Sequence, residues 1–338
     1  MEVIARYRRL VIATACLTFV VVVVGAFVRL MDAGLGCPDW PGCYGAVTPL
    51  HAVDDIAKAV AAQGGEHGPV SLRKAWKEMV HRYLAGALGL LILAVAATAW
   101  RRRYVLAQSP ALPTALLGLV VFQAALGMWT VTLLLKPVIV TLHLLGGMAT
   151  LALVTWLTLR QLSLPERRVF AAATPRRLRP WAALALVIVV MQIALGGWVS
   201  SNYAALACVD LPTCHGEWVP DMDFKHGFQL VRELGRTADG GHLAYAALTA
   251  IHWTHRVGAL VTFVLVGALA IALMRLEGMK GLGTTLTALL FLQVGLGIAN
   301  VAAGLPLAVA VAHNAVAAVL LVTLVVINFH LSRAASPS

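Results

Sequence analysis

Charged residues are scarce in this chain. Only 12% of its 338 residues are Asp, Glu, Lys or Arg, and 60% are hydrophobic. An ordinary water-soluble domain carries about 25% charged residues, so the composition excludes that class. The formal net charge is +11, but the basic residues do not gather in one patch. A nucleic-acid-binding protein is therefore not expected either.

The chain also lacks the small-residue cleavage site that a secretory signal peptide would need before Asp32. Its first apolar segment is therefore expected to stay as a membrane helix. Apolar runs of about 20 residues, long enough to cross a bilayer core of about 30 Å, recur along the chain. Runs of this length in lipid are helices, because helices satisfy their own backbone groups. We predict eight transmembrane helices, at 10–31, 78–100, 111–131, 138–159, 180–202, 247–274, 283–303 and 307–330. The fold class is an all-α integral membrane protein.

Basic residues mark one side of the predicted helices. They precede the first helix and follow the second, fourth, sixth and eighth, at Arg6, Arg8, Arg9, Arg101, Arg102, Arg103, Arg160, Arg167, Arg168, Arg176, Arg177, Arg179, Arg275, Lys280 and Arg333. Short basic loops remain in the cytoplasm. We therefore expect both termini inside and the two long segments, 32–77 and 203–246, on the outer side.

The sequence contains an internal duplication. The segment VRLMDAGLGCPDWPGCYG from Val28 is echoed by VSSNYAALACVDLPTCHG from Val199. Equivalent residues keep a nearly constant offset: 171 positions from Cys37 to Cys208, 174 from His81 to His255, and 170 from His143 to His313. A fixed period indicates repeated structural units. We predict two pseudo-symmetric four-helix bundles in tandem and parallel, at 1–160 and 180–338, with a cytoplasmic linker at 161–179.

Each half carries two histidines in apolar helices, which are His81 and His143 in the first and His255 and His313 in the second. Facing imidazoles on neighbouring bundle helices are what a six-coordinate haem iron requires. A single intramembrane histidine is often a packing residue, but two matched pairs at matched depth favour ligands. Zinc or copper is less consistent with the pattern, because neither half gathers three or four close ligands.

Three arginines lie near these histidines. Arg82 and Arg256 directly follow a histidine, and Arg29 ends the first helix. A buried guanidinium needs a partner, and haem propionates are suitable bidentate partners. The alternative is that these side chains extend to phospholipid headgroups.

Glu78 breaks the repeat. It lies one helical turn before His81, and the aligned residue of the second half is His252. We therefore place the reaction in the first half, where the carboxylate would act as a general base or stabilise a cation. The alternative is an interfacial glutamate paired with Arg82 or Lys77. His252 shares a helix face with His255 and is a candidate to support that ligand.

Four of the five cysteines lie in the two outer segments, as two Cys-x5-Cys pairs. Three interpretations are open: a structural disulfide in each loop, a redox-active pair at Cys37 and Cys43, and metal binding through Cys214 with His215.

The sequence resembles the haem A synthase family over nearly its whole length, in the cysteine-containing bacterial type. The most specific motifs are GLGCPDWPGC at 34–43, E-x-x-H-R at 78–82, the TLH ending at His143, IHWTHR at 251–256 and the histidine of AHNA at 312–315. Residues 44–75 are the least similar portion, and no role is assigned to them.

The resemblance implies a role for each matching residue. His81 and His143 would bind the iron of the substrate haem O, and Glu78 would be the catalytic carboxylate. His255 and His313 would bind the iron of a haem b cofactor. The cysteines would form the disulfides Cys37–Cys43 and Cys208–Cys214.

The implied reaction is oxidation of the C8 methyl group of haem O to the formyl group of haem A, with oxygen derived from water. The implied location is the bacterial cytoplasmic (inner) membrane, upstream of terminal oxidase assembly. Direct delivery by haem O synthase and self-association into homo-oligomers are left open. Two alternatives keep the histidine pairs: a dihaem b-type electron-transfer protein, and a haem transporter or chaperone.

Overall fold

The computed structural model describes residues 2–63, 65, 68, 70–162 and 174–333. Over this part of the chain the regular structure is helical, and eight helices are long and apolar enough to cross a membrane. They are α1 (Glu2–Leu30), α3 (Leu72–Arg101), α5 (Ala111–Thr132), α6 (Pro137–Gln161), α7 (Thr174–Ser201), α9 (Tyr245–Met274), α10 (Lys280–Ala302) and α11 (Leu307–Arg333). The prediction of an all-α integral membrane protein is confirmed.

The helix boundaries agree with the apolar runs except where a helix begins with polar residues. Helix α3, for example, begins at Leu72 rather than at residue 78. The Ser71 side chain accepts a hydrogen bond from the backbone N–H of Lys74 at 3.2 Å and caps this helix. Such a cap satisfies one of the free N–H groups of the first turn, so the helix starts before its apolar stretch.

Four short helices had no counterpart in the sequence prediction. They are η1 (Pro49–Ala52), α2 (Val53–Ala62), α4 (Arg103–Leu106) and α8 (Phe224–Gly227). Helix α2 buries Ile56 in an apolar cluster that contains the cysteines of the first outer segment, and its members are Cys37, Cys43, Ala52, Ile56, Val70, Ala75 and Met79. The segment 44–75, to which no role was assigned, therefore covers one side of this cysteine pair.

The chain divides into two compact units that do not follow the predicted halves residue for residue. Unit 1 comprises 1–150, 200–202 and 228–243, and unit 2 comprises 151–199, 203–227 and 244–338. The second outer segment thus contributes residues to both units. Most of the predicted linker lies at 163–173, outside the described residues, so the division at 160 and 180 stays a prediction, as does the sidedness of the termini.

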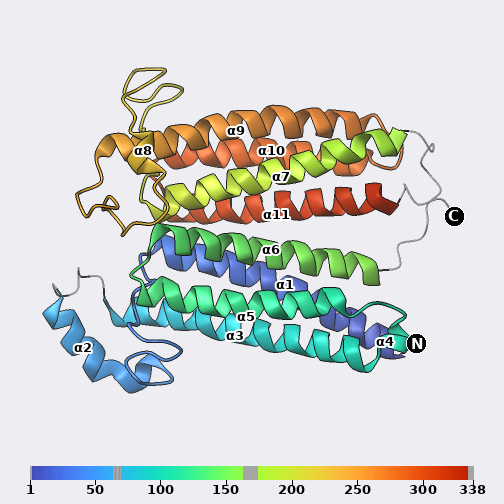
Figure 1. Cartoon of the computed structure of the whole chain (residues 1–338), viewed down its shortest axis with the longest axis horizontal. Coiled ribbons are helices and arrows are strands. Elements are labelled where there is room, and N and C mark those ends of the chain that lie inside the picture. Colours follow the sequence, from blue (N-terminus) through green and yellow to red (C-terminus); the bar gives the residue numbers. More distant parts are fainter. Residues whose placement is uncertain (1, 64, 66–67, 69, 163–173, 334–338) are drawn as a thin grey trace. The chain divides into compact units, whose positions relative to one another are not determined.

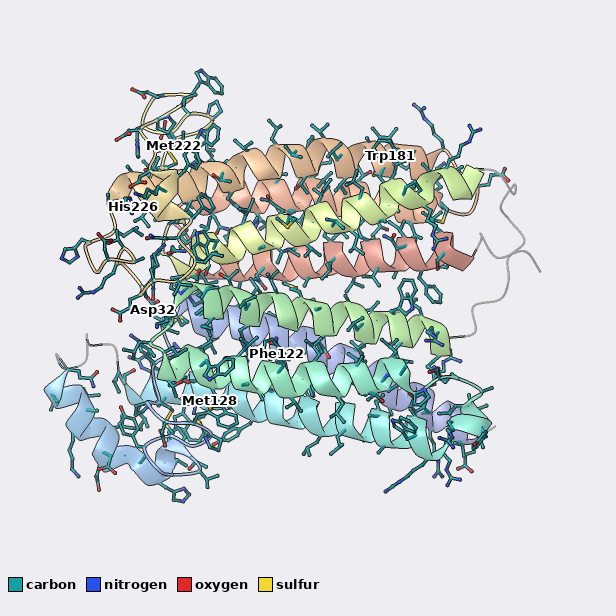
Figure 2. All side chains as sticks on the ribbon, in the orientation of Figure 1. Asp32, Phe122, Met128, Trp181, Met222 and His226 are labelled. Atoms are coloured by element: carbon teal, nitrogen blue, oxygen red, sulfur yellow. A yellow bond between two sulfur atoms is a disulfide. The ribbon has the colours of Figure 1, made fainter. Side chains whose placement is uncertain are left out.

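In unit 1, α1, α3, α5 and the first part of α6 form a bundle of helices that run side by side (Figure 1). Glycines allow the close approaches of α6. A Cβ placed on Gly146 would lie 1.6 Å from the Gln123 side chain of α5, and one on Gly127 of α5 would lie 3.4 Å from the His143 ring. Asp32 lies at the end of this bundle where the outer segment begins (Figure 2).

Unit 2 contains the bundle of α7, α9, α10 and α11. Helix α10 packs against both α9 and α11, and Asn328 of α11 donates a hydrogen bond to the Ala182 carbonyl of α7 at 3.0 Å. Trp181 lies near one end of this bundle, and Met222 and His226 lie in the loop region at the other (Figure 2). The histidines predicted as ligands lie on these packed helices.

Candidate functional site

His81 and His143 in unit 1 each lie against a glycine of the neighbouring helix. A Cβ on Gly25 of α1 would be 3.0 Å from the His81 ring, and a Cβ on Gly127 of α5 would be 3.4 Å from the His143 ring. Any larger residue at Gly25 would displace the ring. Both imidazoles are half-buried, and the Nδ1 atom of each is buried without a hydrogen-bond partner among the described residues.

The same arrangement recurs in unit 2. A Cβ on Gly196 of α7 would be 3.2 Å from the His255 ring, and a Cβ on Gly297 of α10 would be 3.3 Å from the His313 ring. Gly196 stands 171 positions after Gly25, and Gly297 stands 170 after Gly127. The glycines and histidines therefore repeat as a set, with each histidine ring lying against the glycine of an adjacent helix.

These residues fit a haem with two imidazole ligands. Each pair comes from two helices of one bundle, which is how bundle proteins bind cofactors in their cores. Three of the four rings, those of His81, His143 and His313, have a buried Nδ1 atom with no partner among the described residues. Within the same part of the chain, no three His, Cys, Asp or Glu residues converge as a metal-binding group. The donor set is thus the two-histidine set typical of haem iron.

A disulfide-closed loop lies next to the His81 helix. Cys37 and Cys43 are joined by a disulfide, and a bridge between Cys43 and Ala46 closes the turn. The Asp39 carboxylate accepts hydrogen bonds from the backbone N–H groups of Tyr44 at 2.6 Å and Gly45 at 2.8 Å. Gly45 has φ +74°, a conformation that glycine adopts at little cost. The loop is therefore fixed by its own carboxylate.

Glu78 and Arg82 of α3 attach this loop to the bundle. The Glu78 carboxylate, 4% exposed, accepts a hydrogen bond from the Cys37 N–H at 3.0 Å and pairs with the Arg82 guanidinium. Arg82 also donates to the carbonyls of Asp39 at 2.8 Å and Gly42 at 2.5 Å. A pairing of Glu78 with Arg82 is what the interfacial-glutamate alternative predicts. The carboxylate is buried, however, rather than exposed at an interface.

In unit 2, His252 and Arg256 make the equivalent attachment. Cys208 and Cys214 form a disulfide, and the Cys208 N–H donates to Nδ1 of His252 at 3.2 Å. Arg256 donates to the carbonyls of Cys208 at 2.7 Å, Asp210 at 2.8 Å and Thr213 at 2.8 Å. His252 thus occupies the hydrogen-bonding position of Glu78 without a carboxylate. This contact supports the loop, and a supporting role of His252 for His255 stays a prediction.

The three arginines predicted near haem propionates have protein acceptors. Arg82 and Arg256 bind the loop carbonyls, and Arg29 donates to the Ser200 carbonyl at 2.5 Å and pairs with Asp32 at 3.2 Å. Their contact with propionates stays a prediction. The metal-binding interpretation of Cys214 and His215 is wrong, because Cys214 is in a disulfide and the His215 ring lies 2.9 Å from the Ala207 carbonyl.

Two glutamines beside the histidines had no role in the sequence prediction. Gln192 Nε2 lies 3.1 Å from Nδ1 of His255, and Gln293 Nε2 lies 3.2 Å from Nε2 of His313. Gln293 repeats Gln123 at the offset of 170, so the duplication could have identified Gln293 as a candidate site residue. Gln192 aligns with Val21 and left no such signal.

Arg256→Leu is expected to loosen the second disulfide loop while leaving the disulfide intact. The substitution removes hydrogen bonds from a charged donor to three backbone carbonyls, each contributing on the order of 1.5–3 kcal/mol when the group is buried. Hydrogen exchange of residues 208–217 should become faster in the variant. Unchanged exchange there would show that the disulfide alone holds the loop.

The acid sensitivity of this loop is expected to depend on Asp210. Hydrogen bonds from the Thr213 hydroxyl and from the N–H groups of Gly216 and His215 hold the pKa of Asp210 below its ordinary value. Because the folded pKa is lowered, the stabilisation is complete above the unfolded value of about 3.9 and is lost as pH falls further. Asp210→Asn should therefore lower the unfolding temperature at neutral pH, and the difference from the parent should shrink below about pH 4. A difference independent of pH would contradict this.

Eight membrane-crossing helices, two intramembrane histidine pairs and two disulfide loops define a multi-pass membrane protein with paired histidine sites. Residues 8–325 match the family COX15-CtaA, described as cytochrome oxidase assembly protein. The chain belongs to this family.

Curated relatives are similar over nearly the whole chain. The heme A synthase of Shewanella oneidensis is 43% identical over 319 residues, which cover 94% of each protein. The heme A synthase of Methylobacterium radiotolerans is 30% identical over 342 residues, covering 94% of this chain and 88% of the relative. That of Rhizorhabdus wittichii is 29% identical over 330 residues, covering 92% and 89%.

Proposed function

We propose that this protein is a haem A synthase that oxidises the C8 methyl group of haem O to a formyl group. In this proposal His81 and His143 bind the iron of haem O, and His255 and His313 bind the iron of a resident haem b. The observation that carries it is the matched set of histidines against glycines, combined with a buried carboxylate, Glu78, one helical turn from only one of the pairs. The heme A synthases among the relatives support the same activity.

The oxidative half-reaction of the substrate is CH₃ + H₂O → CHO + 4 H⁺ + 4 e⁻, and an external electron acceptor must take up the four electrons. Haem b, when bound, would supply one-electron redox chemistry. The residues of the chain would hold the substrate iron and manage protons near the methyl group. Glu78 is the group suited to the last task, because a positioned carboxylate assists attack by water.

The contacts of Glu78 leave it capacity for this role. Each carboxylate oxygen accepts more than one hydrogen bond, and the described contacts are the backbone N–H groups of Gly36 and Cys37 and the Arg82 guanidinium. These three donors fix the carboxylate in place, which reduces the reorganisation that catalysis would otherwise require. In the second half the imidazole of His252 is used for the same loop contact. Chemistry that needs a carboxylate is thereby confined to the first half.

The distribution of Lys and Arg supports an orientation with both termini in the cytoplasm and the disulfide loops outside, where disulfides persist. The relatives are bacterial, which favours the cytoplasmic membrane. We further propose that haem O synthase supplies the substrate and that the product enters cytochrome oxidase assembly, in keeping with the family description.

The test is to express the protein in cells that make haem O but no haem A, to purify it and to analyse the haems extracted from it. We expect a pyridine haemochrome spectrum with haem b, and haem A separated by chromatography only when the protein is present. A dihaem electron carrier would bind haem b without haem A, and a transporter would move haem across vesicle membranes without altering it. Either result would overturn the proposal.

A further inference from the structure

Among the four imidazoles, His255 is the one whose Nδ1 atom has a protein partner. Gln192 of α7 places its Nε2 atom 3.1 Å from His255 Nδ1 and donates to the His255 backbone carbonyl at 3.0 Å. When Nε2 of His255 binds iron, its Nδ1 carries the proton, and the Gln192 amide would accept a hydrogen bond from that N–H through Oε1 after a half-turn about its last side-chain bond. One amide thus lies against both the ring and the backbone of this residue. Nδ1 of His81, His143 and His313 is without such a partner in the described part of the chain.

A glycine makes room for the Gln192 amide. A Cβ on Gly258, one turn beyond His255 in α9, would lie 2.3 Å from Gln192 Oε1 and 3.0 Å from Leu195. Contacts this short do not occur between real atoms, so even an alanine at residue 258 would push the amide away from its position. Gln192 and Gly258 thus form a complementary pair across two helices.

The first half has apolar residues at both equivalent positions. Gln192 stands four residues before Gly196, as Val21 stands four before Gly25, and both glycines contact the corresponding histidine. Gly258 stands three residues after His255, as Leu84 stands three after His81. A valine and a leucine offer no hydrogen bond to an imidazole, which agrees with the unpartnered Nδ1 of His81.

A histidine that binds a metal is usually oriented through its other ring nitrogen, and loss of that partner typically weakens metal affinity about 10–100-fold. We propose that Gln192, accommodated by Gly258, is a positioning residue that makes the His255–His313 pair the firmly holding haem site. The first pair, which has Val21 in place of a glutamine, holds its haem more loosely and can exchange it. This inference rests on the proposed function, and it accounts for one resident and one exchangeable haem in two bundles built on the same plan.

The experiment measures haem release to an excess of apomyoglobin, in a His81→Ala background in which the first pair lacks a ligand. Gln192→Val, which installs the residue of the first half, is expected to release haem about 10–100-fold faster than the background protein. The low-spin ferric electron paramagnetic resonance signal should also shift, because the His255 ring is no longer held in one orientation. The variant must remain folded and monodisperse, so that the shift of the resonance signal reports the orientation of the ring and not a general loss of packing.

Gly258→Ala is the second variant, since it keeps the amide and displaces it. It should release haem faster as well, and the double variant should be no worse than the more severe single variant, because both remove one contact. Val21→Ala, at the matched position of the first half, should leave the release rate and the signal unchanged.

Release from Gln192→Val at the background rate, with an unshifted signal, would overturn the inference while leaving the proposed function intact. Equal acceleration by Val21→Ala would also overturn it, because the effect would then be a loosening of the bundle. If His255→Ala and the parent protein had identical haem spectra, no haem would be held at this pair, and the proposed function would fail with the inference.

Discussion

Glu78→Gln is expected to reduce conversion of haem O to haem A by at least about 100-fold, the lower range for loss of a general acid–base group. Glutamine has nearly the same shape, and its amide oxygen still accepts the Cys37 N–H that the carboxylate accepts at 3.0 Å. The negative charge and the second acceptor oxygen are lost, so the amide NH2 group takes the place of the oxygen that pairs with Arg82. The measurement is chromatography of extracted haems, with haem b in the same extract as an internal reference.

Glu78→His sharpens this test. Histidine is the residue of the second half at the aligned position, where His252 accepts the Cys208 N–H at 3.2 Å beside Arg256. The variant therefore keeps an arrangement that this fold already uses to hold its loop, but without a carboxylate. We expect haem b to stay bound and haem A to be absent.

Two results would contradict a catalytic role for Glu78. Haem A formation by Glu78→His at the parent rate would show that the side chain serves only to attach the loop. Loss of haem b together with haem A would show that the substitution disrupts the bundle. Asp54→Asn, an exposed substitution on α2 of the same unit, is the matched control and should change neither.

Substitution of one histidine in each pair is expected to have the second large effect, on the haem content and on haem A formation. His313→Ala should remove the resident haem b, because a second ligand of the iron is lost, and haem A formation should fall below detection. His143→Ala should leave haem b bound and abolish the conversion, since that residue belongs to the other pair. The measurement is the pyridine haemochrome spectrum per mole of protein.

The unfolding temperature gives an independent measure of the same effect. A ligand bound 1,000-fold above its dissociation constant stabilises a protein by about 4 kcal/mol. His313→Ala should therefore lower the unfolding temperature more than His143→Ala does in protein purified without substrate. Equal loss of haem from both variants would contradict the assignment of one haem to each half.

A comparison of the predicted and observed helix boundaries shows which of them hydropathy can predict. The eight membrane segments follow from apolar runs alone, because each is long enough to be recognised without knowledge of its neighbours. The start of α3 at Leu72 did not follow, since its first turns are polar and are held by the Ser71 cap. Helix α2 was missed for a related reason: it is short, and Ile56 gains its burial from residues distant in the sequence.

The arginines illustrate a different limit. Arg82 and Arg256 were expected near haem propionates because a buried guanidinium requires a partner. Contact with propionates stays a prediction, but the sequence does not specify which protein acceptors lie within reach. The folded loops present their carbonyls to both side chains, at 2.8 Å from Asp39 and 2.8 Å from Asp210. Only the tertiary structure reveals that partner.

By itself, the sequence determined the membrane class, the duplication, the two histidine pairs and the one carboxylate that is not repeated, because these depend on residue type and period. The tertiary structure decided which groups touch. It placed Glu78 and His252 in the same hydrogen-bonding position and set Gln192 against His255 through the space left by Gly258. These contacts join positions 41, 44 and 63 residues apart and depend on the shapes of the side chains that meet there. A periodic pattern along the sequence does not specify them.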